Sequence, residues 1–175
     1  MSKVEARFQS RNRTVTDAQP RARFAGVLAA VAALCFSQWA LGQGAPRPEA
    51  LIKWRQSAYQ VLAWNSGRIK TALAGQYTPL EVQAAANALA AVANSGLATL
   101  FAPGTADGKG WRETTARDEV FSDTAKFRAL TEEFAREAST LARLATAGDR
   151  ATVNEQFLKV AQSCKTCHEK FRQTD

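Results

Sequence analysis

The 175-residue chain has little of what most metal, redox and sheet proteins depend on. It contains one histidine (His168), one methionine (Met1), three cysteines and five prolines. Outside residues 1–42 only three Cys or His side chains remain, fewer than the four that a structural zinc site takes. No cluster of Cys, His or carboxylates has catalytic spacing, so we expect no substrate-turnover enzyme. The Ala-rich composition without strand-like alternation predicts an all-α protein.

The chain also has little excess positive charge outside its N-terminal region. The formal net charge is +7, but six of the 23 Lys and Arg residues lie in residues 1–42 with only two acidic residues. The remainder has 17 basic and 14 acidic residues, a net charge of +3. A nucleic-acid-binding patch would need a larger and more concentrated excess. We therefore predict no nucleic-acid partner.

An uncharged apolar run, residues 24–41, follows the basic N-terminal region and precedes small residues around Gly42. This order is typical of a secretory signal peptide. We expect cleavage after Gly42, with residues 1–42 as leader and residues 43–175 as one mature domain. Cys35 would be removed with the leader. The run also reaches about the lower limit for crossing a bilayer, so the alternative is an uncleaved inner-membrane anchor.

The most informative stretch is Cys164-Lys165-Thr166-Cys167-His168. Two cysteines two residues apart, followed directly by histidine, form the attachment motif of a c-type haem. The thiols add across the haem vinyl groups, and the imidazole can bind the iron from one side. Export fits this prediction, because such haem is attached outside the bacterial cytoplasm. The alternatives are a metal site or a dithiol, although a thioredoxin-like pair would follow a strand.

The composition also bears on the sixth iron ligand. His168 is the only histidine, and Met1 lies in the predicted leader. The usual second ligands of electron-transfer cytochromes, His or Met, are therefore lacking. We expect one axial position to be empty or weakly filled.

Apolar periodicity and end signals predict four helices after residue 46. The first runs over about 49–73, with Leu51, Trp54, Ala58, Val61, Leu62, Ile69 and Leu73 facing inward. The second begins at a Thr78 cap and continues toward Phe101, before Pro103-Gly104. A long connection over 103–121 follows, and the third helix begins near Ser122-Asp123 and ends at Gly148.

The fourth helix is capped by Asp149 or by a Thr152-x-x-Glu155 box. Its apolar positions recur at steps of four and three, which is the seam of a bundle helix: Val153, Phe157, Val160, Cys164, Cys167 and Phe171. Both cysteines lie on this seam, so we expect the haem in the bundle core. Short, long and short connections predict an antiparallel up-down-up-down four-helix bundle with covalent haem near the C-terminus.

Over roughly residues 48–172 the chain resembles the cytochrome c′ family of four-helix-bundle c-type cytochromes. The most specific stretches are Lys53-Trp54-Arg55-Gln56-Ser57, Phe101-Ala102-Pro103-Gly104-Thr105, and Ser163 through His168 with Phe171-Arg172. The resemblance implies one haem c on Cys164 and Cys167 with His168 as proximal iron ligand. It also implies homodimers through the first two helices.

The same resemblance implies further haem contacts. Arg172 matches an arginine beside the proximal face, and Arg55 and Gln56 match positions at the haem edge and propionates. Tyr59 falls at the distal position, where its hydroxyl could hydrogen-bond a bound diatomic molecule. Phe101 is implied as a packing contact, but Ala98 replaces a tryptophan that relatives often carry before it. The alternatives without a haem contact are an exposed Arg172, a solvated pair of Arg55 and Gln56 at the start of the helix, and a Tyr59 that packs in the core.

Three functions remain open at this point. The first is a periplasmic haem protein with five-coordinate, high-spin iron that binds NO and CO and is capable of one-electron transfer. The second is a dedicated electron carrier with a periplasmic redox partner, in which Lys or Tyr supplies the sixth ligand. The third is a haem-free interaction bundle with two structural thiols.

Overall fold

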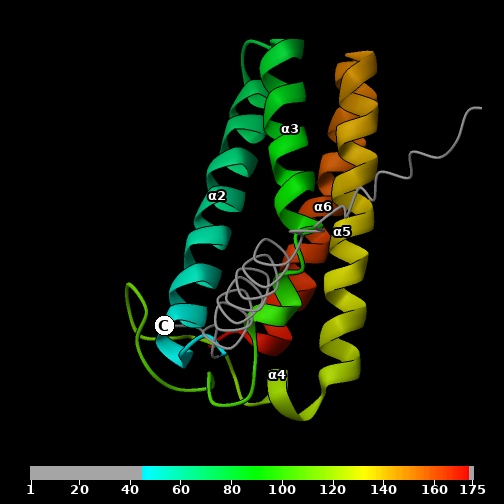
Figure 1. Cartoon of the computed structure of the whole chain (residues 1–175). Coiled ribbons are helices and arrows are strands. Elements are labelled where there is room, and N and C mark those ends of the chain that lie inside the picture. The colour runs from blue at the N-terminus through cyan, green and yellow to red at the C-terminus, as the bar shows by residue number, and fades with distance from the viewer. Residues whose placement is uncertain (1–44, 174–175) are drawn as a thin grey trace, which may run out of the picture. The chain divides into compact units, whose positions relative to one another are not determined.

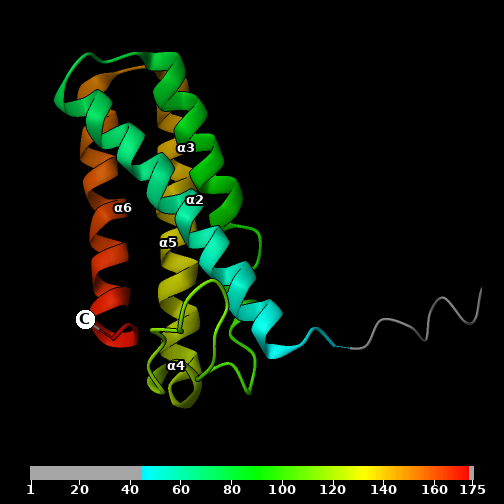
Figure 2. The same cartoon turned by 90° about the vertical axis from the view of Figure 1, so that its left-hand side faces the viewer.

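The computed structural model describes residues 45–173, and the predicted leader over residues 1–42 lies outside them. Four long helices run side by side in alternating directions (Figures 1 and 2): α2 (Pro48–Ala74), α3 (Pro79–Ala93), α5 (Thr124–Ala147) and α6 (Arg150–Phe171). The predicted all-α, up-down-up-down bundle is confirmed. No helix among the described residues is long and apolar enough to cross a membrane.

The helices are not equally close to one another. α3 packs extensively against α2 and α5, and α5 against α6, whereas α2 and α6 barely touch. In Figure 2, α2 crosses the bundle at an angle, and its N-terminal part lies apart from the C-terminal part of α6. The bundle is therefore open along one edge near the end of α6.

The buried face of α2 differs from the predicted one. Trp54 and Val61, expected to face inward, are 51% and 41% exposed. The buried positions are Ile52, Arg55, Leu62, Asn65, Ile69 and Ala72. Leu62 and Ile69 are buried as predicted, but near the start of α2 the buried positions are shifted by one residue, from Leu51 and Trp54 to Ile52 and Arg55. α2 carries apolar residues on both sides, so periodicity alone does not distinguish its core face from its outer face.

α3 is shorter than predicted. It ends at Ala93, and the chain turns at Gly96, whose φ of 85° favours glycine. A short 3-10 turn, η1 (Leu97–Leu100), then leads to Phe101. Thr78 occupies the cap position, but its backbone carbonyl rather than its hydroxyl accepts the first amides, and no side-chain cap forms.

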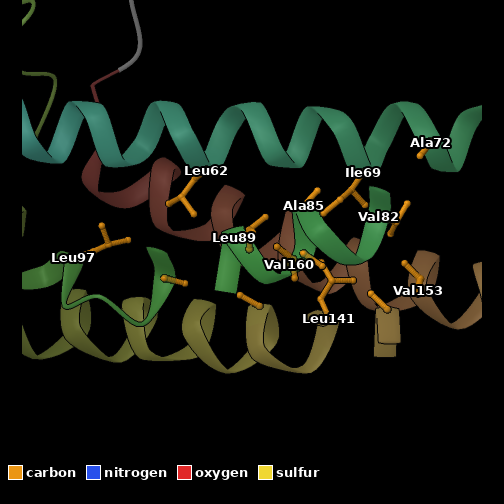
Figure 3. Close-up of a cluster of buried hydrophobic side chains, with 14 residues drawn as sticks. Leu62, Ile69, Ala72, Val82, Ala85, Leu89, Leu97, Leu141, Val153 and Val160 are labelled. Atoms are coloured by element: carbon orange, nitrogen blue, oxygen red, sulfur yellow. The ribbon is translucent and has the colours of Figure 1, made fainter. Parts of the chain in front are cut away.

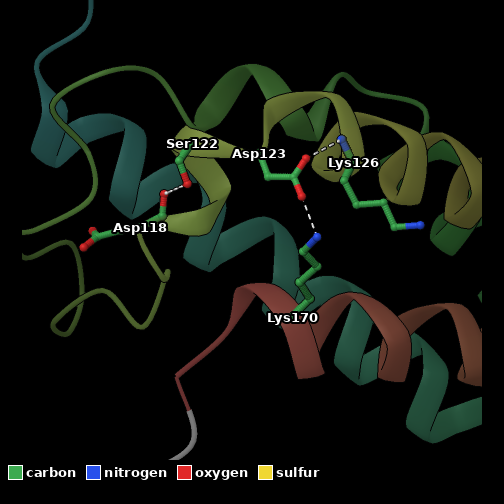
Figure 4. A network of polar contacts seen from close by, with 5 residues as sticks. All are labelled: Asp118, Ser122, Asp123, Lys126 and Lys170. Carbon is green, nitrogen blue, oxygen red and sulfur yellow. Dashed lines mark hydrogen bonds and ion pairs between the residues drawn. The ribbon is translucent and has the colours of Figure 1, made fainter.

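The long connection includes a single helical turn, α4 (Glu119–Ser122), before α5 begins at Thr124. Asp123 caps α5 by accepting a hydrogen bond from the Lys126 amide (Figure 4). Its other carboxylate oxygen forms an ion pair with Lys170 of α6. This pairing lowers the pKa of Asp123, first through the hydrogen bond from Lys170. It ties the start of α5 to the end of α6.

The turn between α5 and α6 matches the prediction. Gly148 ends α5 in the left-handed conformation, with φ of 74°. Asp149 then caps α6 by accepting from the Thr152 amide at 2.8 Å. Of the two predicted caps, the structure selects Asp149.

Most of the core lies in the half of the bundle away from the cysteines. Figure 3 shows its side chains converging from all four long helices, among them Leu62, Ile69, Leu89, Leu141 and Val160. A smaller buried cluster lies at the other end: Val120, Phe127, Leu130 and Phe171. On α6, Gln156 and Ser163 are buried where Phe157 and Cys164 were expected to be deepest, and these two are half-buried.

Candidate haem site

The last turns of α6 present the two thiols and the imidazole. Cys164 and Cys167 are half-buried and form no disulfide, and the next residue, His168, is exposed. Burial raises the pKa of both thiols, that of Cys167 to about 11, with a smaller contribution from Cys164. Both thiols are therefore protonated near neutral pH.

A cavity of about 420 Å³ lies between α2, α5, α6 and the connection before α5. All eight residues predicted for the site line it: Arg55, Gln56, Tyr59, Phe101, Cys164, Cys167, His168 and Arg172. Apolar side chains from α5 and η1 form much of the remaining wall, including Leu97, Phe127, Leu130 and Phe134. The sparse contact between α2 and α6 makes room for it. The fold thus gathers residues more than 100 positions apart around one hollow.

Arg55 lies in the cavity wall and is only 3% exposed. Its guanidinium donates to Thr105 Oγ1 at 2.8 Å, to the Thr105 carbonyl at 2.7 Å and to Thr114 Oγ1. Its Cζ lies 4.6 Å from the Phe101 ring centre. Burial lowers the pKa of Arg55 from its usual value. A buried cation whose partners are neutral oxygens is well suited to a nearby anion.

Tyr59 follows Arg55 by one helical turn and begins a row of aromatic rings. The Tyr59 and Phe101 rings are 6.3 Å apart, those of Phe101 and Phe127 4.8 Å, and those of Phe127 and Phe171 5.2 Å, all edge to face. Burial raises the pKa of Tyr59. The side chain is therefore a neutral phenol over the physiological range, able to donate a hydrogen bond into the cavity.

Gln56 also lines the cavity, but its amide is engaged with the connection. Its Oε1 accepts from the Trp111 amide at 2.7 Å, and its Nε2 donates to the Arg112 carbonyl at 2.8 Å. The haem contact implied for Gln56 stays a prediction, and the structure adds a second role in holding the loop.

Arg172 lies directly after α6, where its backbone amide donates to the His168 carbonyl at 3.0 Å. Burial, and secondarily the charge of Arg172, lower the pKa of His168. A neutral imidazole is the form that binds a metal. Both residues also line a second, more open depression on the outer side of α6, together with Cys164, Lys165 and Glu169.

Sequence reasoning assigned no role to the polar residues of the connection, although Thr105 lies in a stretch that carries the family resemblance. Thr105, Arg112 and Thr114 lie in a segment without periodicity. Thr114 and Arg112 line the cavity, and the fully buried Thr105 holds Arg55. Nothing in the local sequence signals Arg112 and Thr114, because they are defined by contacts with α2 more than 50 residues earlier.

The cytochrome C′ family model matches residues 50–172, which include all but the first two residues of the bundle and every residue that lines the cavity. The chain belongs to the cytochrome c′ family. It is 48% identical over 130 residues to cytochrome c′ of Rhodocyclus tenuis, covering 74% of this chain and 98% of that protein. Cytochrome c′ of Allochromatium vinosum is 41% identical over 125 residues, covering 71% and 81%.

Solved structures agree with this family assignment. Cytochrome c′ of Thermochromatium tepidum superposes with a TM-score of 0.72 at 38% identity, covering 75% of this chain and all of that one. A cytochrome c′ described as having ligand-controlled dimer dissociation gives a TM-score of 0.72 at 39% identity, with the same coverage.

Cytochromes c′ carry haem c, and the cavity of this chain fits that group. Its volume lies in the range of cofactor pockets, about 300–1,000 Å³. Its wall combines apolar side chains with the protonated thiols, an imidazole and the buried Arg55 cation. Cys164 and Cys167 would hold the group covalently and His168 would bind its iron. Arg55 would lie near its carboxylates.

Proposed function

We propose that this cytochrome c′ family member is a periplasmic gas-binding protein with five-coordinate, high-spin iron, His168 being the only protein ligand. The observation that carries the proposal is the composition of the cavity wall. Besides the two thiols and His168, Tyr59 is the lining side chain best able to coordinate iron, and burial keeps it a neutral phenol. A neutral phenol is a poor iron ligand. When bound, the haem supplies an axial position for a small ligand and a one-electron couple.

The wall favours small uncharged ligands. Apolar side chains from η1 and α5 form much of the cavity wall, and an anion next to them would lose hydration that they do not replace, whereas NO or CO loses little. The Tyr59 hydroxyl can donate a hydrogen bond to such a ligand. Solved structures of Alcaligenes xylosoxidans cytochrome c′, 31% and 32% identical to this chain, include an NO complex of one single-residue variant and a CO complex of another.

The test is the visible absorption spectrum of the mature protein, ferric and ferrous, before and after CO. We expect a broad, unsplit ferrous band that sharpens with CO. Tyr59→Phe should keep the high-spin spectrum and speed CO dissociation, because the hydrogen bond is lost. The matched control is Tyr77→Phe, which removes the hydroxyl of the only other tyrosine, outside the cavity wall. Sharp, split ferrous bands indifferent to CO would contradict the proposal.

The runner-up function is a dedicated electron carrier with a recruited Lys or Tyr ligand and a periplasmic redox partner. Split, CO-insensitive bands would favour it, and loss of those bands in Tyr59→Phe would identify the ligand. Its weak point is the cavity wall, whose lining residues among those described include no lysine. Relatives in the family are haem proteins, and we infer that this chain likewise catalyses no substrate turnover.

Periplasmic location rests on the leader over residues 1–42. Expression of the full chain in a Gram-negative bacterium with haem-attachment machinery should yield a haem protein in the periplasmic fraction, with an N-terminus after Gly42. Recovery of the uncleaved chain with the inner membrane would favour the anchor instead.

The outer face of α2 supports a homodimer. Trp54, Val61 and Trp64 are 51%, 41% and 65% exposed and lie within one side of the helix. Several large exposed apolar side chains on one side of a helix are typical of an interface. We expect Trp64→Glu to lower the dimer fraction in sedimentation velocity. Leu158→Glu, at a residue 61% exposed on α6, should leave it unchanged.

A further inference from the structure

Several hydrogen bonds join the connection before α5 to the first turns of α2. The Gln56 side chain binds backbone on both of its polar atoms. Oε1 accepts from the Trp111 and Arg112 amides at 2.7 and 3.3 Å, and Nε2 donates to the Arg112 and Glu113 carbonyls at 2.8 and 3.5 Å. The Gln56 amide thus both accepts hydrogen bonds from loop N–H groups and donates them to loop carbonyls.

Neighbouring contacts also join this loop to the start of α2. The Trp111 indole donates to Ser57 Oγ at 2.8 Å, and Lys53 Nζ lies 4.3 Å from the Trp111 ring centre. Gly110 approaches so closely that a Cβ there would lie 2.7 Å from the Lys53 backbone nitrogen. The backbone of the loop at Gly110 therefore packs directly against the backbone of α2 at Lys53.

These contacts determine where Arg112 lies. Gln56 binds both its amide and its carbonyl, and Arg112, an exposed residue, is one of those that line the same cavity as Arg55. Both ion pairs among residues 45–173 involve lysines, so neither arginine has a carboxylate partner in that part of the chain. Three arginines thus line the cavity without an acidic partner among residues 45–173, namely Arg55, Arg112 and Arg172, and a haem carries two carboxylates.

We propose that Arg112 binds one haem carboxylate, and that Gln56 acts as a positioning residue by fixing Arg112 rather than through its own contact with the haem. The inference depends on haem binding and not on the proposed gas ligand. Arginine suits this role because its fork matches carboxylate geometry. A positive charge beside the haem favours the reduced, less positive iron and so raises the reduction potential.

The first experiment measures the reduction potential and the propionate bending bands in the resonance Raman spectrum of the holoprotein. Arg112→Gln should lower the potential and shift one propionate band, and Arg112→Lys should restore most of the potential because it keeps the charge. Lys109→Gln is the matched control, since it removes one charge from the same loop at an exposed residue outside the cavity wall. Equal shifts in Arg112→Gln and Lys109→Gln, with unchanged Raman bands, would overturn the contact.

The second experiment separates positioning from direct contact by a double-mutant cycle. Gln56→Leu should lower the potential in the same direction as Arg112→Gln, and the double variant should show little more than Arg112→Gln alone. Additive shifts would mean that Gln56 acts on the haem independently, and would overturn its positioning role. Circular dichroism of each variant verifies that the bundle is retained, and a potential unchanged in Gln56→Leu also contradicts the proposal.

Discussion

Arg55 and Thr105 show how single buried polar residues connect distant parts of this chain. Thr105 is fully buried, accepts from Arg55 and donates to the Ala102 carbonyl at 2.8 Å. Its hydroxyl therefore satisfies a cation and a carbonyl at once. Without this hydroxyl, Arg55 Nη1 keeps only a 3.4 Å contact to the Leu100 carbonyl, and the Ala102 carbonyl keeps only the Thr105 amide. Loss of a hydrogen bond to a buried cation costs more than the bond itself contributes.

We therefore expect Thr105→Val, which keeps the shape and removes the hydroxyl, to lower the free energy of unfolding by about 1–3 kcal/mol. Thr99→Val is the control, because the Thr99 hydroxyl also donates to a backbone carbonyl, of Gly96, but is exposed. Chemical denaturation of both variants measures the difference. Equal small losses would mean that the Arg55 network contributes little to stability.

Tyr59 gives a residue-scale prediction of pH dependence. Burial raises its pKa, so folding favours the neutral phenol. The unfolded chain loses this proton near the ordinary pKa of about 10 and the folded chain only at higher pH. Stability linked to Tyr59 is thus fully present below about pH 10 and falls as the pH rises further.

The measurement is the unfolding free energy of the wild type and Tyr59→Phe between about pH 9 and 11, a range that spans the ordinary tyrosine pKa. The variant should lose less stability across this range. Parallel curves would show that Tyr59 is accessible to solvent in the folded protein.

At the scale of the element, helix ends are defined by local chemistry. Gly148 ends α5 with a positive φ. A Cβ added to Gly148 would lie 3.5 Å from the Pro79 Cβ. Gly67 is the opposite case, because it lies inside α2 with no neighbouring atom within 4 Å of an added Cβ. The same residue type is required at one position and unfavourable at the other.

We predict opposite effects of the same substitution at these two glycines. Gly148→Ala should destabilise the protein by about 1 kcal/mol or more, because alanine is strained in the left-handed region. Gly67→Ala should stabilise it by about 0.5–1 kcal/mol, because alanine loses less backbone entropy in a helix. Thermal unfolding of the two variants provides the comparison, and a loss of stability in Gly67→Ala would indicate that α2 is covered there.

At the scale of the whole molecule, the two ends of the bundle are stabilised differently. The larger buried cluster, around Leu89 and Leu141, is packed by the protein's own side chains. The end with Cys164 and Cys167 contains the 420 Å³ cavity and a smaller cluster. Part of that end's packing must come from the cofactor that the cavity fits.

A haem-free variant, Cys164→Ser/Cys167→Ser, should therefore be less stable locally, only at the end of the bundle that contains the cavity. We expect faster amide hydrogen exchange in the first half of α2 and the last turns of α6 than in the holoprotein, with little change around Leu89 and Leu141. Exchange followed by mass spectrometry measures this difference. A uniform increase along all four helices would mean that the far core is not independently stable.

Several features could be predicted because they depend on neighbouring residues alone. The Cys164–His168 motif, the Asp149 cap and the Gly148 stop act over at most a few positions, and each lies where local chemistry places it. The single histidine and methionine limit the iron ligands whatever the fold. The sequence by itself therefore determined the four long helices, their antiparallel bundle and the cysteines and histidine that can hold the haem.

Only the tertiary structure decided which side of α2 is buried and how the connection runs. α2 has apolar residues on opposite sides, and burial of Arg55 instead of Trp54 follows from partners at Thr105 and Thr114. Gln56 fixes Arg112 in the same way, across 56 residues. Such contacts depend on two distant segments meeting in one geometry. That information lies in the packing of the whole chain and in no local pattern.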